Sequence, residues 1–121
     1  MFVMIKNIFK KIFLRIRGEV DTATLVLRGM KVGANFHRMQ GVLIDPGHCF
    51  LIKIGNNVTL GPRSYLLAHD ASLQHPLGMT KIGLINIGNN VFVGADSIIL
   101  PGVTIADNVI IGVNSVITKD M

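Results

Sequence analysis

Aliphatic residues recur at every sixth position over most of this chain, and that spacing restricts the possible folds more than any other feature of the sequence. One register holds Ile54, Leu60 and Leu66 and, after an interruption, Ile87, Val93, Ile99, Ile105, Ile111 and Ile117. A second column, four residues further along, contains only valine and serine: Val58, Ser64, Val91, Ser97, Val103, Val109 and Ser115. A period of six matches neither the 3.6-residue period of an α-helix nor the alternation of a half-buried strand.

Residues that favour turns follow the aliphatic positions, as in the run Gly88-Asn89-Asn90. Glycine, asparagine and aspartate tolerate left-handed backbone angles and therefore mark tight corners. A corner every six residues produces a three-sided prism in which each short strand points one aliphatic side chain inward. The coils then stack at about 4.8 Å and pair through their backbones. We therefore predict an all-β fold, a left-handed parallel β-helix of hexapeptide repeats with about four coils.

The repeat continues upstream in a less regular form. Val32, Arg38, Ile44 and Phe50 keep the six-residue step, although an arginine is out of character at such a position. The register then slips by two over 51–53, which predicts a bulge or short loop there. With room for one domain in 121 residues, we assign 18–121 to the β-helix and 1–17 to a separate leader.

The leader has the pattern of a basic amphipathic helix, shorter than the ~20 apolar residues that span a bilayer. One face carries Ile5, Ile8, Phe9, Ile12, Phe13 and Ile16, and the other carries Lys6, Asn7, Lys10, Lys11, Arg15 and Arg17. Leu14 is the one clear exception, because it falls on the polar face. Such a helix can lie in an anionic membrane surface, or it can pack on its own body or on a neighbouring subunit.

The net charge of +5 comes entirely from the leader, because seven cations and seven anions balance from Gly18 onward. The body therefore has no basic stripe, and we expect no nucleic-acid partner. The single cysteine, Cys49, allows no intrachain disulfide and fits a cytoplasmic protein. Next to Phe50, it is expected to be a small apolar core residue and not a nucleophile.

The interruption of the repeat, over 67–86, is the segment where chemistry is expected, since loops on rigid repeat scaffolds carry function. His69 stands at its start, still held by the strand around Leu66, and His75 lies in its middle. A histidine side chain titrates near neutrality and can remove the proton of an attacking hydroxyl. Asp70 could orient such a histidine, although neighbours on an extended backbone face apart.

Two runs carry a resemblance to a known family: IKIGNNVTLGPRSYLLAHDAS at 52–72 and INIGNNVFVGADSIILPGVTIADNVIIGVNSVITKDM at 85–121. They resemble the hexapeptide-repeat O-acetyltransferases, including galactoside, maltose and serine acetyltransferases and those acting on capsular or lipopolysaccharide sugars. The resemblance implies a homotrimer with active sites between subunits, acetyl-CoA as co-substrate, a sugar-like acceptor and no metal. It assigns His69 as general base, Asp45 as an acceptor contact, and Ala95, Val113, Thr118 and Lys119 as coenzyme contacts.

The sequence departs from that family at its end. Family members usually continue past the Thr-Lys-Asp segment with a proline-rich strand that closes the coenzyme groove, whereas this sequence stops at Met121. Weaker coenzyme binding and an open last coil are the expected consequences.

Two alternatives of other classes follow from the same fold. One is a zinc hydratase resembling the γ-class carbonic anhydrases, with ligands drawn from His37, His48, His69 and His75. The spacing from His69 to His75, broken by Pro76, does not match the closer histidine pair of that family. The other is a non-catalytic trimeric scaffold. Metal analysis distinguishes the first from an acetyltransferase, and coenzyme A binding distinguishes the second.

Overall fold

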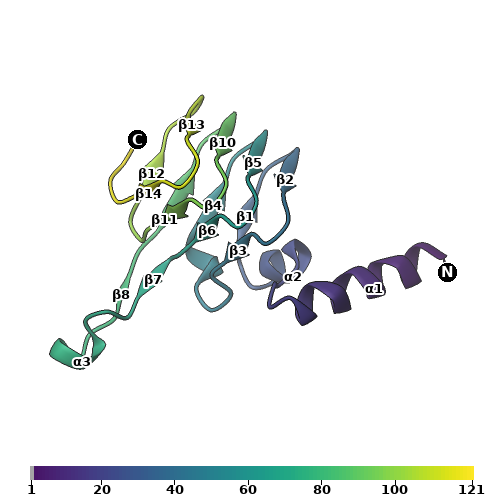
Figure 1. The fold of residues 1–121 in the computed structure, drawn as a ribbon, viewed down its shortest axis with the longest axis horizontal. Helices are drawn as coiled ribbons and strands as arrows, with labels where there is room; N and C mark the ends of the chain where they lie inside the picture. The colour runs from purple at the N-terminus through teal and green to yellow at the C-terminus, as the bar shows by residue number, and fades with distance from the viewer. Residues whose placement is uncertain (1) are drawn as a thin grey trace.

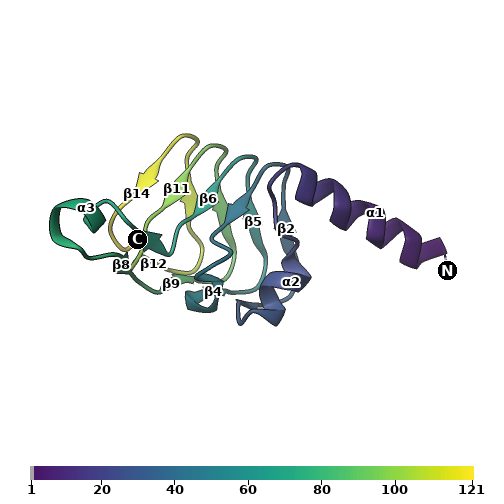
Figure 2. The same ribbon diagram turned by 90° about the horizontal axis from the view of Figure 1, so that it is seen from below.

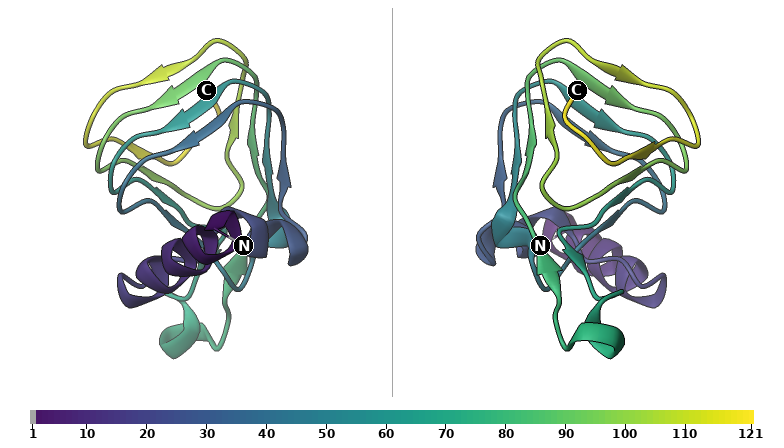
Figure 3. Two further views of the ribbon diagram at one scale, coloured as in Figure 1. Left: turned by 90° about the vertical axis from the view of Figure 1, so that its right-hand side faces the viewer. Right: turned by 90° about the vertical axis from the view of Figure 1, so that its left-hand side faces the viewer.

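Three parallel sheets wind around one axis in the computed structural model, which describes residues 2–121. Sheet A contains β1 (Lys31–Val32), β4 (Ile52–Ile54), β9 (Ile85–Ile87) and β12 (Thr104–Ile105). Sheet B contains β2 (Phe36–Arg38), β5 (Val58–Leu60), β10 (Val91–Val93) and β13 (Ile110–Ile111), and sheet C contains β3 (Leu43–Ile44), β6 (Tyr65–Leu66), β11 (Ile98–Ile99) and β14 (Val116–Ile117). Seen end-on, the coils form a triangle (Figure 3), which confirms the predicted left-handed parallel β-helix.

The interior of the prism is the aliphatic column that the six-residue repeat predicted. Every member from Ile54 to Ile117 is buried, and so are Ser64 and Ser97 of the second column. Each serine is tolerated in this interior because its hydroxyl donates a hydrogen bond to a corner carbonyl: Ser64 to Gly61 at 2.8 Å and Ser97 to Gly112 at 3.0 Å. The core therefore needs no polar partner from outside the coils.

Left-handed residues form the corners, as the sequence predicted. Between sheets A and B, the positive φ angles belong to asparagines: Asn35, Asn57, Asn90 and Asn108. Their amides form a ladder in which Asn57 donates to Asn90 at 3.1 Å and Asn90 donates to Asn108 at 3.0 Å. Asparagine therefore serves twice at this edge, since it accepts the αL conformation and also links successive coils.

Coil stacking at the corner between sheets B and C leaves no room for a side chain at Gly94. A Cβ atom there would lie 2.6 Å from the Val113 amide nitrogen, whereas at Gly112, the same repeat position one coil later, the nearest atom is 4.0 Å away. We expect Gly94→Ala to lower the free energy of unfolding by about 1–3 kcal/mol and Gly112→Ala to change it little. Urea unfolding of the two variants checks this, and equal stabilities would contradict the stacking.

The first coil is closed by a short helix and an arginine. Helix α2 (Thr22–Leu27), capped by Asp21, places Leu25 fully out of solvent. The Arg38 guanidinium occupies the position of an aliphatic residue and donates to the carbonyl oxygens of Val20 at 2.6 Å and Val42 at 2.9 Å. Arg38 thus donates hydrogen bonds to backbone carbonyls at the end of the prism, where no neighbouring coil supplies N–H donors.

The register slip is a single 3₁₀ turn, η1 (Cys49–Leu51), which leads into β4. It turns Phe50 outward with 55% of its surface exposed, so the prediction that Phe50 continues the inward column is wrong. Cys49 is buried as expected, and burial raises the pKa of its thiol.

The leader forms helix α1 (Phe2–Ile16), which extends from the first coil away from the prism (Figures 1 and 2). Among the apolar side chains from Val3 to Ile16, only Leu14 is partly covered. The possibility that the apolar face packs on its own body is therefore wrong, and α2 rather than the leader covers the first coil. Within residues 2–121 no helix combines the length and the apolar character needed to cross a bilayer.

The interruption of the repeat is a hairpin that leaves the prism between sheets C and A. Strands β7 (His69–Asp70) and β8 (Lys81–Ile82) pair antiparallel, and the short helix α3 (Gln74–Leu77) forms the tip (Figure 1). The next coil begins with β9 at Ile85. The base of this hairpin, not its tip, lies beside Asp45, which contacts His69 at the start of β7.

Candidate active site

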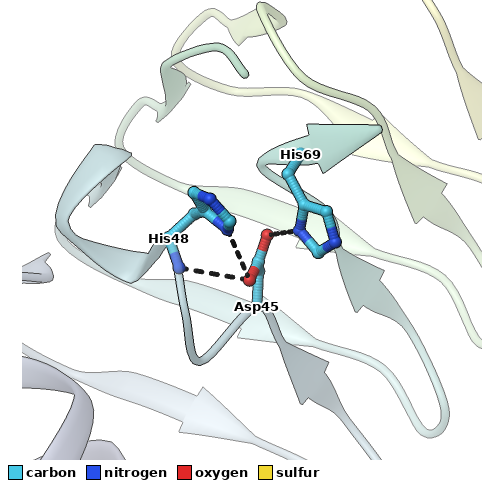
Figure 4. Close-up of side chains that lie close together, drawn as sticks. All are labelled: Asp45, His48 and His69. Atoms are coloured by element: carbon cyan, nitrogen blue, oxygen red, sulfur yellow. Dashed lines mark hydrogen bonds and ion pairs between the residues drawn. The ribbon is translucent and has the colours of Figure 1, made fainter. Parts of the chain in front are cut away.

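The chain brings Asp45 and His69 together at one edge of the prism, between sheets C and A. Asp45 directly follows β3, and His69 begins β7 soon after β6. Because β3 and β6 pair in register, with Ile44 opposite Leu66, the residues that leave these strands lie one above the other. Their side chains point toward each other and form a hydrogen-bonded pair between His69 Nδ1 and Asp45 Oδ2 (Figure 4).

The Asp45 carboxylate is held in place by backbone amides. Its Oδ1 accepts hydrogen bonds from the N–H groups of Gly47 and His48, both at 3.2 Å, and its Oδ2 accepts one from Ala68 at 3.2 Å. The side chain is 1% exposed. The Pro-Gly turn that follows Asp45 points the N–H groups of Gly47 and His48 back toward the carboxylate. Two of its three backbone donors therefore come from the residues that immediately follow it.

These contacts keep Asp45 ionised. Burial alone would raise the pKa of its carboxyl group, but the hydrogen bonds and charges of His69 and then His48 outweigh burial, so the pKa lies below its ordinary value. A fixed negative charge consequently stands behind His69 throughout the neutral range.

The other ring nitrogen of His69 is free to accept a proton. With Nδ1–H donating to Asp45, the neutral ring carries its lone pair on Nε2. The side chain is 34% exposed, so the ring is anchored on one side and accessible on the other. An anchored, accessible imidazole backed by a carboxylate is the arrangement that removes a proton from an attacking hydroxyl.

A second imidazole, that of His48, completes the cluster. Its Nδ1 lies 3.4 Å from Asp45 Oδ1, and its ring centroid lies 4.6 Å from that of His69 (Figure 4). From the sequence, His48 shares a Pro-Gly turn with Asp45 and was considered as a zinc ligand, but not as a partner of the carboxylate. The signal that could have placed it beside the carboxylate is local, because an aspartate and a histidine three residues apart across Pro-Gly face each other in a tight turn.

The same three residues could hold a metal ion, since one ligand atom from each of Asp45, His48 and His69 lies within 4.8 Å of the others. The carboxylate, however, already accepts three backbone N–H bonds along with the two histidine contacts, which fills its lone-pair directions. Of the four histidines considered as zinc ligands, His48 and His69 meet here. His37, on β2, instead forms a hydrogen bond with Asn35, and His75 lies in α3. The donor set fits a carboxylate–imidazole pair better than a zinc centre.

The residues predicted to contact coenzyme lie along the two edges of sheet C. Ala95 and Val113 stack at the edge with sheet B, where the Asn114 amide donates to the Ala95 carbonyl at 2.8 Å. Thr118 and Lys119 follow β14 at the other edge, the one that carries His69 in a lower coil. Val113, Thr118 and Lys119 are exposed, and Ala95 is half-buried. Asp70 does not orient His69, because its carboxylate accepts the Ser72 amide at 2.9 Å.

Comparison with known proteins agrees with this fold and these repeats. Residues 85–119 match the family described as bacterial transferase hexapeptide (six repeats). Galactoside O-acetyltransferase of Escherichia coli (strain K12) is 37% identical over 93 residues, which cover 74% of this chain and 45% of that protein.

Two solved structures extend the likeness. A maltose O-acetyltransferase from Clostridium difficile 630 matches with a TM-score of 0.65 and 39% identity, over 77% of this chain and 50% of that one. A hexapeptide-repeat acetyltransferase from Vibrio cholerae O1 biovar eltor, complexed with acetyl-CoA, matches with a TM-score of 0.69 and 26% identity, over 78% and 52% respectively.

The repeats and the prism define the chain as a hexapeptide-repeat β-helix. With these likenesses, it resembles the hexapeptide-repeat acyltransferases in its repeats and its fold. The chain spans about half the length of the relatives it matches.

Proposed function

We propose that this protein transfers an acetyl group from acetyl-CoA to a hydroxyl of a sugar or similar small acceptor. The observation that carries the proposal is the half-exposed His69 imidazole held by the buried Asp45 carboxylate at the base of the hairpin. The naming of relatives as galactoside and maltose O-acetyltransferases, and the acetyl-CoA complex of the Vibrio cholerae protein, support the acetyl donor and the class of acceptor.

The proposed step is a direct transfer. His69 Nε2 takes the proton of the acceptor hydroxyl as its oxygen attacks the thioester carbonyl carbon of acetyl-CoA. The C–S bond then breaks, the acceptor becomes an acetyl ester, and the proton passes from the imidazolium to the departing coenzyme A thiolate. Asp45 holds the ring in the Nδ1–H tautomer and stabilises the imidazolium by its charge. This orienting role suits a carboxylate that is 1% exposed better than the direct acceptor contact that the resemblance assigned to Asp45.

The acetyl-CoA groove is proposed to lie between two neighbouring subunits, flanked by the edge of Ala95 and Val113 and by the edge of Thr118 and Lys119. Backbone groups at Ala95 and Val113 would meet the pantetheine arm, and the Lys119 ammonium would attract a phosphate of the coenzyme. All four positions lie in the upper coils, on the edges that flank one face of the prism.

The outward side of sheet C is proposed to be the trimer contact. Its four strands present a column of apolar side chains in register: Leu43, Tyr65, Ile98 and Val116. Leu43 and Val116 are exposed, and Tyr65 and Ile98 are half-buried. Sheet A presents polar side chains at the equivalent positions, among them Lys53, Asn86 and Thr104. A contiguous apolar column on one face marks an association surface, and it would place the partner subunit beside the proposed groove.

Calorimetric titration of the purified chain with acetyl-CoA tests the proposal, together with its mass from light scattering. We expect a trimer that binds one acetyl-CoA per subunit and binds coenzyme A as well. A folded trimer that binds neither would contradict the acetyltransferase and support the scaffold alternative. Stoichiometric zinc found in the purified protein by metal analysis would favour the hydratase.

A further inference from the structure

Helix α1 presents its apolar face away from the protein. Its basic and polar residues Asn7, Lys10, Lys11 and Arg17, with Leu14, line a cavity of about 560 Å³ between the helix and the body. Leu14 was the exception on the polar face of the helix, and its place beside the body explains that exception. The opposite face carries side chains that are all exposed: Ile5, Ile8, Phe9, Ile12, Phe13 and Ile16. A body-packed amphipathic helix would have the reverse orientation.

The charges of α1 are arranged on both flanks of this apolar face. At about 100° per residue, its six isoleucine and phenylalanine side chains cover an arc of about 140°. Lys6 and Lys10 follow on one side of the arc, and Arg15 and Lys11 follow on the other. Arg17 also lies on the first side, but it forms an ion pair with Glu19 at 3.3 Å. No acidic residue occurs before Glu19. Long cationic side chains beside an apolar strip can reach lipid headgroups while the strip itself enters the acyl region.

We propose that α1 docks this protein on an anionic membrane surface, with the helix lying in the plane of the interface. A 15-residue helix is roughly 22 Å long, which is too short to cross a hydrocarbon core of about 30 Å. The charge pattern favours lipid over a second copy of the helix, because a second α1 would bring its own cations next to these. The helix is joined to the body through Gly18, whose φ is +76°. A Cβ atom added at Gly18 would have no other atom within 4 Å.

Docking through α1 leaves the catalytic edge free. The helix leaves the prism at the first coil, whereas His69 and the excursion hairpin lie further along the prism, with α3 at the far end from α1 (Figures 1 and 2). The inference is independent of the acetyl-transfer chemistry, since it uses no residue of the proposed active site.

Vesicle co-sedimentation tests the proposal with the full chain. We expect the protein to sediment with vesicles of phosphatidylcholine mixed equally with phosphatidylglycerol, and to do so less at high salt. Vesicles of phosphatidylcholine alone should retain much less protein. Protein that remains in the supernatant with the anionic vesicles would overturn the proposal.

A matched pair of double variants distinguishes binding through α1 from nonspecific hydrophobic binding to the vesicles. Replacing Phe9 and Ile12 by serine should lower the partition onto anionic vesicles by at least about tenfold. Replacing Phe92 and Ile110 by serine removes the same two residue types from the exposed side of sheet B and should leave the partition unchanged. Undiminished binding of the Phe9/Ile12 variant would contradict the proposal. A changed oligomeric mass of that variant without lipid, with no vesicle binding by the parent, would assign the face to a second copy instead.

Discussion

Replacing His69 by alanine is expected to reduce turnover by about 10²- to 10⁴-fold, the range for loss of a general base. Its imidazole forms a hydrogen bond with the buried Asp45 carboxylate through Nδ1 and is 34% exposed, so Nε2 remains accessible. Because His69 is not among the residues proposed to hold acetyl-CoA, the affinity for the coenzyme should change little.

The comparison variant for this experiment is His75→Ala, which removes a histidine from the tip of the same hairpin, in α3. We expect His75→Ala to retain the parent's turnover. Turnover of His69→Ala within about threefold of the parent would contradict its assignment as the base. A matching loss in acetyl-CoA affinity would show that the side chain acts in binding.

Replacing Asp45 by asparagine is expected to remove most of the turnover while keeping the shape of the site. The amide oxygen will face the pair of donors from Gly47 and His48, because turning it away would leave two N–H groups without an acceptor. The amide NH₂ group then faces His69 and the Ala68 N–H. It donates to His69 Nδ1 and selects the tautomer that carries its proton on Nε2, which cannot act as a base. A fall of about 10²- to 10⁴-fold in turnover is expected.

The same substitution changes stability and its dependence on pH. Loss of the acceptor for Ala68 should lower the free energy of unfolding by about 1–3 kcal/mol. In the parent, the depressed pKa of Asp45 contributes stability above the ordinary carboxyl pKa of about 4, and that contribution is lost as pH falls through the lower folded-state pKa. Asp45→Asn should therefore show a shallower loss of stability in acid. Unfolding curves at neutral and acidic pH that shift equally for both proteins would contradict the role of the charge.

The fold could be predicted from the sequence because its determinants are local and repeated. One inward aliphatic and one left-handed corner in each hexapeptide specify a coil, and stacking repeats that solution. The prediction failed where the repeat is broken. Phe50 kept the six-residue step but lies in the 3₁₀ turn, since Ile52 and Ile54 take the buried positions of the following strand.

The site could be predicted only in part. His69 was identifiable from its place at the start of the interruption, but its partner was not, because the pairing of Asp45 with His69 depends on which coils stack in register. The neighbouring Asp70 was the obvious candidate in the sequence, and it instead holds its own turn. The turn of Asp45 and His48 could be placed one coil below the excursion, but the approach of the His48 ring to within 4.6 Å of the His69 ring could not, because it depends on the conformation of that turn.

The most direct test of the account is the release of coenzyme A thiol from acetyl-CoA, measured with and without a panel of sugars, for the parent and for His69→Ala. The account predicts thiol release that depends on a hydroxyl acceptor, yields an acetyl ester in equal amount, and disappears in the variant. Acceptor-dependent release at the parent's rate in the variant would contradict the Asp45–His69 site, and release without any ester product would contradict acetyl transfer to a hydroxyl.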